Sequence, residues 1–367
     1  MTKIIKVDLG ERTYPIIIQP GILGRIGDTL KRKALSVKRN EPSNRFIIIT
    51  DNNVASIYLN KVIASLKRTG FKSLYKILPT GETQKSLATA NKIYDFLVKH
   101  KIERNDIIIA LGGGVVGDLA GFVAGTYKRG LGLIQVPTSL IAQADSSIGG
   151  KTAVNLDSGK NLVGLFYQPE LVLIDPLLLK SLPEKEFCNG MAEVIKTALI
   201  KDKKLFEMLR DKHKEIINLN PNVLETILAR AIRIKVNIIE QDEKDTKGQR
   251  ILLNYGHTIG HILEASGKYK HYKHGEAISI GMMFSAKIAQ RMKLVGYDFV
   301  KTQSELLKMY HLPTMLKKQI DLSEMISFLH QDKKIKGGKI SEVLPNRIGS
   351  ASIYNVPLSI IRNAFIE

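Results

Sequence analysis

The chain passes directly from the apolar run Ile107-Ile108-Ile109-Ala110-Leu111 into Gly112-Gly113-Gly114-Val115-Val116-Gly117-Asp118. This order is typical of a buried strand, a tight turn and the start of a helix. Because glycines have no Cβ, the N–H groups of such a turn can approach a pyrophosphate closely, and the helix dipole favours its charge. The stretch therefore indicates an α/β sheet with a candidate dinucleotide-binding turn.

The register of Gly112, Gly114 and Gly117 matches G-x-G-x-x-G but departs from an ordinary Rossmann fingerprint. The match lies about a hundred residues into the chain, and no acidic residue follows roughly 20 positions later to bind a ribose. A packed glycine-rich turn without a ligand is the alternative. Asp51, after the apolar residues 46–50, could bind the adenosine ribose or could simply cap a helix.

The first half of the chain alternates apolar runs with helical patterns. Strand-like runs lie at residues 46–50, 74–78, 107–111, 133–136 and 171–174, with helical patterns at 54–69 and 89–101. Because these runs consist mainly of consecutive Ile, Leu and Val residues, we expect burial on both faces and a largely parallel sheet. After about Pro183 long amphipathic stretches dominate, with no clear strand pattern until residues 342–344. We therefore predict a Rossmann-like α/β domain at residues 1–180 and an all-α domain at residues 181–367, joined through residues 175–183.

Composition points to a reducing compartment. The chain has 367 residues and one cysteine, Cys188, so it can form no intramolecular disulfide. Residues 1–20 lack the layout of a signal peptide, and no apolar run approaches membrane-spanning length. We expect a cytoplasmic protein with no membrane association.

The net charge of +20 arises from 55 basic and 35 acidic residues. A nucleic-acid-binding module is one interpretation, but the Lys and Arg residues are scattered along the chain and Trp is absent. A positive field also raises the local concentration of anionic small molecules. We therefore expect an anionic small-molecule substrate and no nucleic acid.

Three residues of metal-binding type stand in helical or glycine-rich settings: Glu193 in NGMAEVIK, His257 in NYGHTIGH and His274 in KHGEA. Together they could hold one zinc ion and leave a fourth position for water or substrate, as catalytic zinc sites do. The spacing does not decide the set, because His257 and His261 stand at i and i+4 on one helical face and also suit a zinc pair.

The segment at residues 137–161 is rich in small polar residues and contains lysines. The stretch runs from Pro137-Thr138-Ser139 through Asp145-Ser146-Ser147-Ile148-Gly149-Gly150-Lys151 to Lys160-Asn161. Hydroxyls, glycine amides and ammonium groups after a strand suit phosphate and carboxylate ligands, although a solvated surface loop has a similar composition.

The chain contains, in order, GGGVVGDLAGFVAGTYKRG, PTSLIAQADSSIGGKTAVN, GKNLVGLFYQP, GMAEVIK, NYGHTIGH and HGEAISIGM. These segments resemble the signatures of the 3-dehydroquinate synthase family, and the resemblance covers roughly residues 45–350. It implies an NAD- and zinc- or cobalt-dependent lyase of the shikimate pathway. Such an enzyme converts 3-deoxy-D-arabino-heptulosonate 7-phosphate to 3-dehydroquinate and phosphate by transient oxidation, phosphate elimination, re-reduction and aldol closure. The resemblance also implies a homodimer with the active site between two domains.

The resemblance also implies roles for individual residues. The metal ligands are Glu193, His257 and His274. Substrate-binding and catalytic residues are Asp145, Lys151, Asn161, Lys196, Arg250, His261 and Arg129. NAD-binding residues are Asp51, Glu82, Lys85, Gly112, Gly113, Gly114, Val115, Val116, Gly117, Asp118, Thr138, Ser139, Lys151, Lys160, Leu178 and Ser181.

Several of these residues have simpler alternatives. Lys196 could form an i,i+3 salt bridge with Glu193, Arg250 could cap a neighbouring element, and Glu82 with Lys85 could be a capping pair. Lys235 is either an anion partner or a helix-face lysine. His271 is an alternative ligand near His274 that the resemblance disfavours. The resemblance leaves His261 either as a group behind the metal ligands or as a substrate-contacting group that shuttles a proton.

Other enzymes of the same two-domain fold remain rivals, because fold alone does not separate glycerol or iron-dependent alcohol dehydrogenases from cyclases of other sugar phosphates. A dehydrogenase would release NADH stoichiometrically.

Overall fold

The computed structural model describes residues 2–34, 45–266, 271–316, 335–336 and 339–366. The chain divides into two compact units. The first comprises Met1–Leu182 with Leu224–Ala229, and the second comprises Pro183–Val223 with Arg230–Glu367. The sequence prediction placed the division after residue 180.

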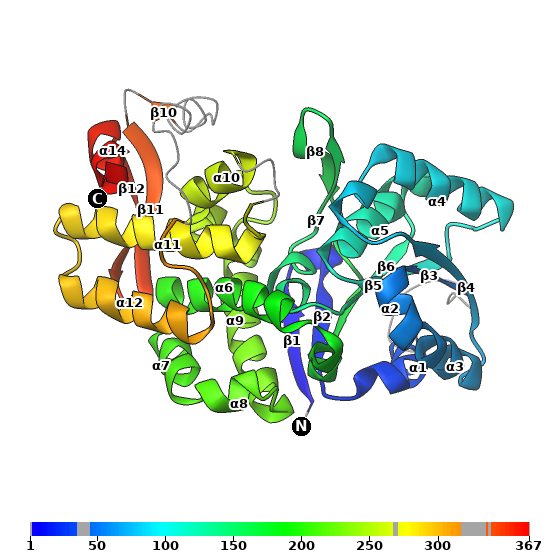
Figure 1. The fold of residues 1–367 in the computed structure, drawn as a ribbon. Coiled ribbons are helices and arrows are strands. Elements are labelled where there is room, and N and C mark those ends of the chain that lie inside the picture. The colour runs from blue at the N-terminus through cyan, green and yellow to red at the C-terminus, as the bar shows by residue number, and fades with distance from the viewer. Residues whose placement is uncertain (1, 35–44, 267–270, 317–334, 337–338, 367) are drawn as a thin grey trace. The chain divides into compact units, whose positions relative to one another are not determined.

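The first unit is built on a seven-stranded sheet with the order β1-β2-β9-β6-β5-β3-β4 (Figure 1). Strands β1 and β2 form an antiparallel pair at one edge, and the other neighbouring strands are parallel. The fold class predicted from the apolar runs is thus confirmed. The strands are β1 (Lys3–Val7), β2 (Tyr14–Ile18), β3 (Arg45–Asp51), β4 (Lys72–Leu78), β5 (Ile107–Gly112), β6 (Gly132–Pro137) and β9 (Leu171–Ile174).

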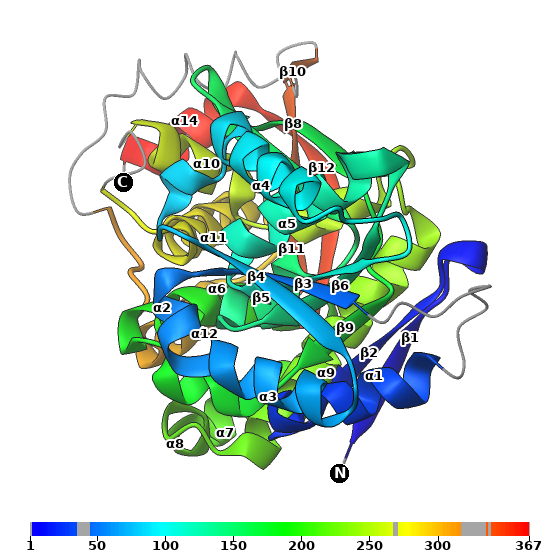
Figure 2. The same ribbon diagram turned by 90° about the vertical axis from the view of Figure 1, so that its right-hand side faces the viewer.

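Helices cover both faces of this sheet (Figure 2). Helices α4 (Leu87–Lys99) and α5 (Gly114–Thr126) pack on one face, and α1 (Ile26–Ala34) and α3 (Asn60–Arg68) pack on the other. Alternate isoleucines of β3 point into opposite clusters, Ile47 with the α4 side and Ile48 with the α1 side. Burial on both faces explains why the central strands have uninterrupted apolar sequences.

The polar stretch after β6 folds into two elements. It forms a π-helical turn at Ala142–Ser146 and then the antiparallel hairpin of β7 (Lys151–Leu156) and β8 (Gly159–Phe166). The sequence prediction contained no hairpin here, because the exposed residues of both strands include polar and glycine residues that hide a period-two pattern. β7 packs on α5, where a Cβ on Gly121 would collide with Thr152.

The second unit is mainly helical. Its helices are α6 (Glu184–Lys201), α7 (Lys203–Asp211), α8 (His213–Ile217), α9 (Pro221–Gln241), α10 (His257–Ser266), α11 (His274–Arg291), α12 (Tyr297–Met309) and α14 (Leu358–Ile366). Residues Leu224–Ala229, in the N-terminal half of α9, are grouped with the first unit. In the described ranges, no helix combines the length and apolar character needed to cross a bilayer.

The expectation that the second unit is all-α was wrong in one respect. An antiparallel sheet of β10 (Ile335–Lys336), β11 (Lys339–Arg347) and β12 (Ser350–Pro357) packs through Ile340, Leu344 and Val356 onto the cluster that contains Ile280 of α11. The apolar pattern was obscured because β11 is buried over consecutive residues and most β12 side chains are small or polar.

Candidate functional site

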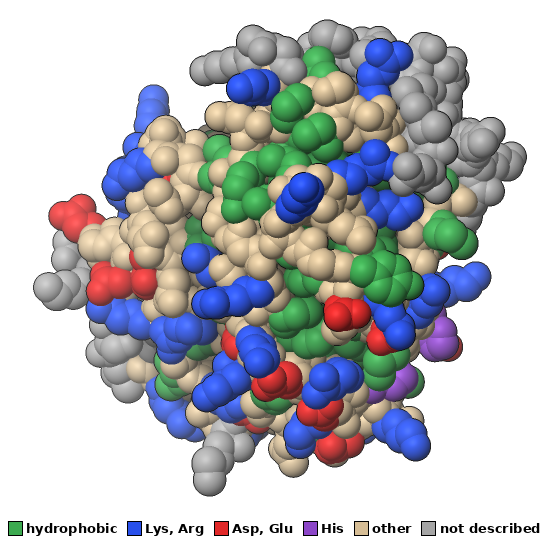
Figure 3. All heavy atoms as spheres, turned by 90° about the vertical axis from the view of Figure 1, so that its left-hand side faces the viewer, with side chains coloured by type: hydrophobic (Ala, Val, Ile, Leu, Met, Phe, Trp, Pro, Cys, Tyr) green, Lys and Arg blue, Asp and Glu red, His purple; other side chains and the backbone are tan. Residues whose placement is uncertain are grey.

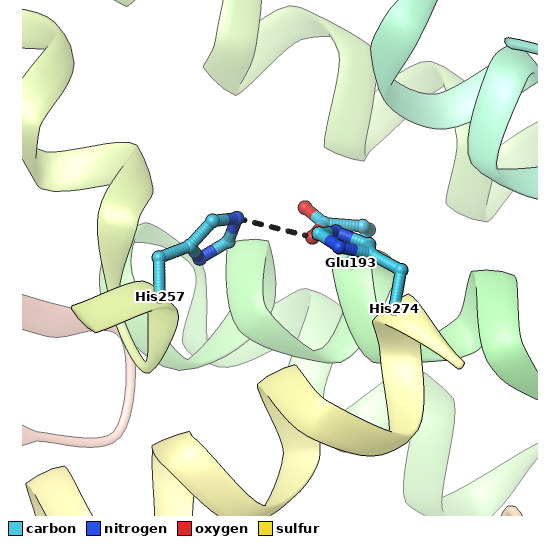
Figure 4. Close-up of side chains that lie close together, drawn as sticks. All are labelled: Glu193, His257 and His274. Carbon is cyan, nitrogen blue, oxygen red and sulfur yellow. Dashed lines mark hydrogen bonds and ion pairs between the residues drawn. The ribbon is translucent and has the colours of Figure 1, made fainter. Parts of the chain in front are cut away.

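Three helices of the second unit bring the predicted metal ligands together (Figure 4). Glu193 lies in the middle of α6, and His257 and His274 are the first residues of α10 and α11. One ligand atom from each residue lies within 4.8 Å of the others. Oε1 of Glu193 is 3.5 Å from Nε2 of His257 and 3.2 Å from Nε2 of His274.

Glycines allow these helices to approach so closely. A Cβ on Gly281 of α11 would collide with the carbonyl oxygen of Gly256, the residue before α10. A Cβ on Gly275 would collide with the backbone of Asn189 in α6, whose Oδ1 accepts a hydrogen bond from the Gly275 N–H. Close packing of α11 against both neighbours therefore places residues from distant parts of the sequence at one point.

Each imidazole is oriented through its other nitrogen. Nδ1 of His257 is 3.2 Å from the carbonyl oxygen of Tyr255, and Nδ1 of His274 is 3.4 Å from Oε2 of the buried Glu264. A carbonyl or carboxylate in this position fixes the tautomer and leaves Nε2 as the metal-binding atom. Both Nε2 atoms face Glu193, so the donor set fits a divalent metal with an open position.

Lys196 is the fourth titratable group of the cluster. It is 2% exposed and forms an ion pair with Oε2 of Glu193, while Oε1 faces the imidazoles. The i,i+3 salt bridge considered from sequence is thus present. Burial alone would raise the pKa of Glu193, but Lys196 and the two histidines outweigh it and hold the pKa well below its usual range. The carboxylate is therefore ionised, as a metal ligand must be.

The two histidines differ in their electrostatic surroundings. Burial, assisted by Lys196, lowers the pKa of His257 well below its usual value. Burial would also lower the pKa of His274, but Glu193 and Glu264 outweigh it and raise it to about 10. In the metal-free protein His257 is neutral and His274 retains a proton that a metal ion would have to displace.

His261 and His271 lie outside the three-residue cluster found among the described residues. The ring of His261 lies 5.3 Å from that of His257, edge to face, and its side chain is exposed. His271 is exposed just before α11. The geometry therefore brings His274 to Glu193 and His257, whereas local spacing favours the i,i+4 partner His261.

The glycine-rich turn of the first unit lies between β5 and α5, as expected. Gly113 precedes α5 and has no side chain to cap its first turn. The hydroxyls of Ser139 and Ser146 lie against the turn. A Cβ added to Gly113 would be 3.4 Å from Oγ of Ser139, and one added to Gly114 would be 3.2 Å from Oγ of Ser146. The Thr138 N–H donates to the Gly112 carbonyl at 2.9 Å. This arrangement suits an anionic group at the helix N-terminus.

Lys85 connects this turn to the hairpin. Its side chain is 7% exposed, and Nζ contacts both Oδ2 of Asp118 and Oδ1 of Asn161. The side chain of Glu82 has a different partner from Lys85. Its Oε1 instead accepts a hydrogen bond of 2.8 Å from Nδ2 of Asn155. The simple capping pair considered from sequence is therefore not formed, since Ser86 caps α4.

Other predicted nucleotide-binding residues have structural contacts of their own. Oδ1 of Asp51 accepts from the N–H groups of Asn53 and Val54, which makes Asp51 a helix N-cap. Leu178 is buried in the core beneath the sheet, and Oγ of Ser181 lies 2.7 Å from the Tyr58 hydroxyl. Asp51 therefore caps a helix in this structure, and its binding to a ribose stays a prediction.

The remaining predicted residues are distributed over both units. Asp145 is half-buried in the π-helical turn, Lys151 begins β7, and Lys160 and Asn161 lie in β8. Arg129 is exposed and has a left-handed backbone conformation with φ of 62°. In the second unit Arg250 is buried and donates to the Glu243 carbonyl at 2.9 Å, and Lys235 is buried in α9. Residues 332–334 begin the segment DKKIKGGKISEVLPNRIG, which also resembles the family more loosely, and they lie outside the described residues.

Sequence reasoning missed Glu264 and Asn155. Glu264 follows His257 by two helical turns, so its position on the same face was a usable signal. Asn155 ends the quoted motif PTSLIAQADSSIGGKTAVN, but its contacts depend on how the hairpin folds back, which no local spacing predicts.

The fold and the site define a class of two-unit proteins in which an α/β unit with a glycine-rich turn accompanies a helical unit with a Glu-His-His cluster. Two solved structures have a similar fold. A 2-epi-5-epi-valiolone synthase from Streptomyces hygroscopicus with NAD+ and Zn2+ bound has a TM-score of 0.85 and 26% identity, covering 96% of each chain. A 2-deoxy-scyllo-inosose synthase complexed with carbaglucose-6-phosphate, NAD+ and Co2+ has a TM-score of 0.86 and 27% identity, covering 99% of each chain.

The chain belongs to the 3-dehydroquinate synthase family. Residues 75–189 match the family's N-terminal model and residues 190–335 match its C-terminal model. The 3-dehydroquinate synthase of Desulforamulus reducens is 43% identical over 350 residues, which is 95% of either chain. That of Rippkaea orientalis is 43% identical over 370 residues, covering 100% of this chain and 99% of the relative.

Proposed function

We propose that this chain is an NAD- and divalent-metal-dependent lyase that converts 3-deoxy-D-arabino-heptulosonate 7-phosphate to 3-dehydroquinate and phosphate. Family membership over nearly the whole chain supports the reaction. The Glu193, His257 and His274 cluster is the single structural observation that carries the proposal. When bound, NAD supplies reversible hydride transfer at one substrate alcohol, and Zn2+ or Co2+ supplies Lewis acidity at the substrate hydroxyls.

The residues of the helical unit would hold the metal and bind anions. One oxygen of Glu193 and the Nε2 atoms of both histidines would be the ligands. Lys196 keeps the carboxylate ionised and oriented through Oε2. Together with Arg250 it would also bind a charged end of the substrate, since ammonium and guanidinium groups suit carboxylate and phosphate oxygens.

His261 would act through its imidazole. It lies beside His257 but outside the ligand cluster, and it is exposed, so its ring nitrogens can exchange protons with a bound molecule. We propose that it moves a proton at a substrate oxygen. Histidine is the side chain that most often does this work.

The residues of the α/β unit would bind the dinucleotide and the rest of the substrate. The N-terminus of α5, with Ser139 and Thr138 beside it, suits the pyrophosphate. Lys151, Lys160, Asn161, Asp145 and Arg129 remain proposed contacts by family resemblance. On the face drawn in Figure 3, Lys and Arg are interspersed with Asp and Glu, which is compatible with a small anionic substrate and differs from the basic stripe of a nucleic-acid-binding surface. The family resemblance also leads us to propose a cytoplasmic homodimer.

The decisive experiment is a turnover assay. The purified protein is loaded with zinc, supplied with catalytic NAD and incubated with the heptulosonate phosphate while phosphate, dehydroquinate and NADH are followed. We expect equal amounts of phosphate and dehydroquinate without net NADH. Stoichiometric NADH would show a dehydrogenase instead, and turnover only with sedoheptulose 7-phosphate would show a different cyclase.

A further inference from the structure

Asn155 is the point at which three segments of the α/β unit meet. Its backbone N–H donates to the Lys85 carbonyl at 2.7 Å. Its Nδ2 donates to Oε1 of Glu82 at 2.8 Å, and its Oδ1 accepts from the backbone N–H of Asn161 at 3.0 Å. One half-buried side chain thus joins strand β7, strand β8 and the segment before α4.

Asn161 and Lys85, both hydrogen-bonded to Asn155, also contact each other. Asn161 adopts a left-handed conformation with φ of 57°, which a non-glycine residue seldom adopts without local hydrogen bonds. The hydrogen bond to Asn155 fixes its N–H, and its side-chain Oδ1 then contacts Nζ of Lys85. The same Nζ pairs with Asp118 in α5, directly after the glycine-rich turn.

We propose that Asn155 is a positioning residue that couples the nucleotide-binding segment at Glu82 and Lys85 to Asn161 in the hairpin. The inference rests on the proposed function, because it assigns these neighbours to NAD and substrate. Asn155 contacts neither ligand in this proposal. It acts by setting the conformation of Asn161 and the positions of Lys85 and Glu82.

The amide of Asn155 meets both hydrogen-bonding requirements of this position. The side chain must donate to a carboxylate on one side and accept from a backbone N–H on the other. Asn155→Asp keeps the acceptor but places a second carboxylate against Glu82, where like charges repel. In Asn155→Asp with Glu82→Gln, the glutamine amide can donate to the new carboxylate and restore the contact with its polarity reversed.

The test is a double-mutant cycle on zinc-loaded full-length protein, with NADH affinity measured by the fluorescence of the bound nicotinamide. We expect Asn155→Asp to weaken NADH binding about 10-fold when Glu82 is present, and less than about 2-fold when it is added to Glu82→Gln. The KM for the substrate should rise in Asn155→Asp when Glu82 is present, and should rise less when the change is added to Glu82→Gln. Asn91→Asp, an exposed change in α4 that adds the same charge, is the control and should leave both unchanged.

The outcomes separate the inference from the proposed function. Equal fold-losses from Asn155→Asp with and without Glu82→Gln, or unchanged NADH binding in Asn155→Asp, would overturn the positioning role while the wild-type enzyme remains active. A lower melting temperature with unchanged NADH affinity would also overturn it, because that result shows a purely structural role. Wild-type protein that neither binds NADH nor turns over would instead refute the proposed function.

Discussion

Oε2 of Glu264 lies 3.4 Å from Nδ1 of His274, while Nε2 of the same imidazole lies 3.2 Å from Glu193. The ring is therefore held between two carboxylates, one of which belongs to the candidate metal cluster. Loss of a group that orients a metal-binding histidine commonly lowers metal affinity about 10- to 100-fold.

The first prediction concerns this contact. Glu264→Ala should lower zinc affinity about 10- to 100-fold, and Glu264→Gln should lower it less because the amide oxygen still accepts from Nδ1. Competition with a chromophoric chelator measures both affinities. Glu305→Ala, at an exposed position in α12, is the control. Wild-type affinity in Glu264→Ala would show that His274 needs no such support.

The identity of the third ligand gives a second prediction. His274→Ala removes a cluster member and should yield protein largely free of zinc after dialysis, whereas His261→Ala should retain most of its zinc and lose turnover. Elemental analysis beside the phosphate-release assay distinguishes the two variants. Zinc lost from His261→Ala but retained by His274→Ala would reverse the assignment.

Helix packing provides the third prediction. Gly281→Ala places a Cβ against the Gly256 carbonyl, so α10 and α11 must move apart. We expect the free energy of unfolding to fall by about 2–3 kcal/mol and zinc affinity to fall with it.

The matched control for this change is Gly296→Ala, where an added Cβ meets no atom within 4 Å. Gly296 precedes α12, so the cost should not exceed about 1 kcal/mol, and zinc affinity should be unchanged. Chemical denaturation and chelator competition provide the two measurements. Equal effects of both substitutions would contradict the close-approach argument.

A fourth prediction is the pH dependence of stability at the start of α7. Both carboxylate oxygens of Asp202 accept from Arg230, at 2.9 Å each, and Oδ1 also caps the helix. Burial opposes ionisation, but these hydrogen bonds outweigh it and lower the pKa of Asp202. Its stabilising contribution is therefore complete above the unfolded pKa of about 4 and disappears as pH falls through the lower folded value.

Asp202→Asn keeps a capping side chain but loses the charge. At pH 7 it should reduce the free energy of unfolding by about 0.2–1 kcal/mol, because the pair is partly exposed. The difference from wild type should vanish in urea titrations at a pH below the folded pKa. A difference that persists unchanged in acid would show that the lost stability does not come from the ionised carboxylate.

Local residue patterns predicted the strands of the parallel sheet but not the two antiparallel hairpins. The apolar runs of β3, β5, β6 and β9 predicted the sheet because burial on both faces selects residue types strand by strand. The strands β11 and β12 were largely missed because apolar and polar residues do not alternate regularly along them. The hairpin of β7 and β8 was missed because its residues are mainly small or polar.

The sequence by itself determined the α/β character of the first unit, the glycine-rich turn before α5 and the family to which the chain is similar, since these depend on residue type and local order. Only the tertiary structure decided which carboxylate and imidazoles meet. The packing of α11 against α6 and α10 joins His274 to Glu193 and His257, although helical spacing alone favours His261. Likewise, the folding of β8 beside β7 decided that Asn155 holds both Glu82 and Asn161. Such contacts join residues far apart in the chain, and their geometry depends on backbone approach that no local pattern records.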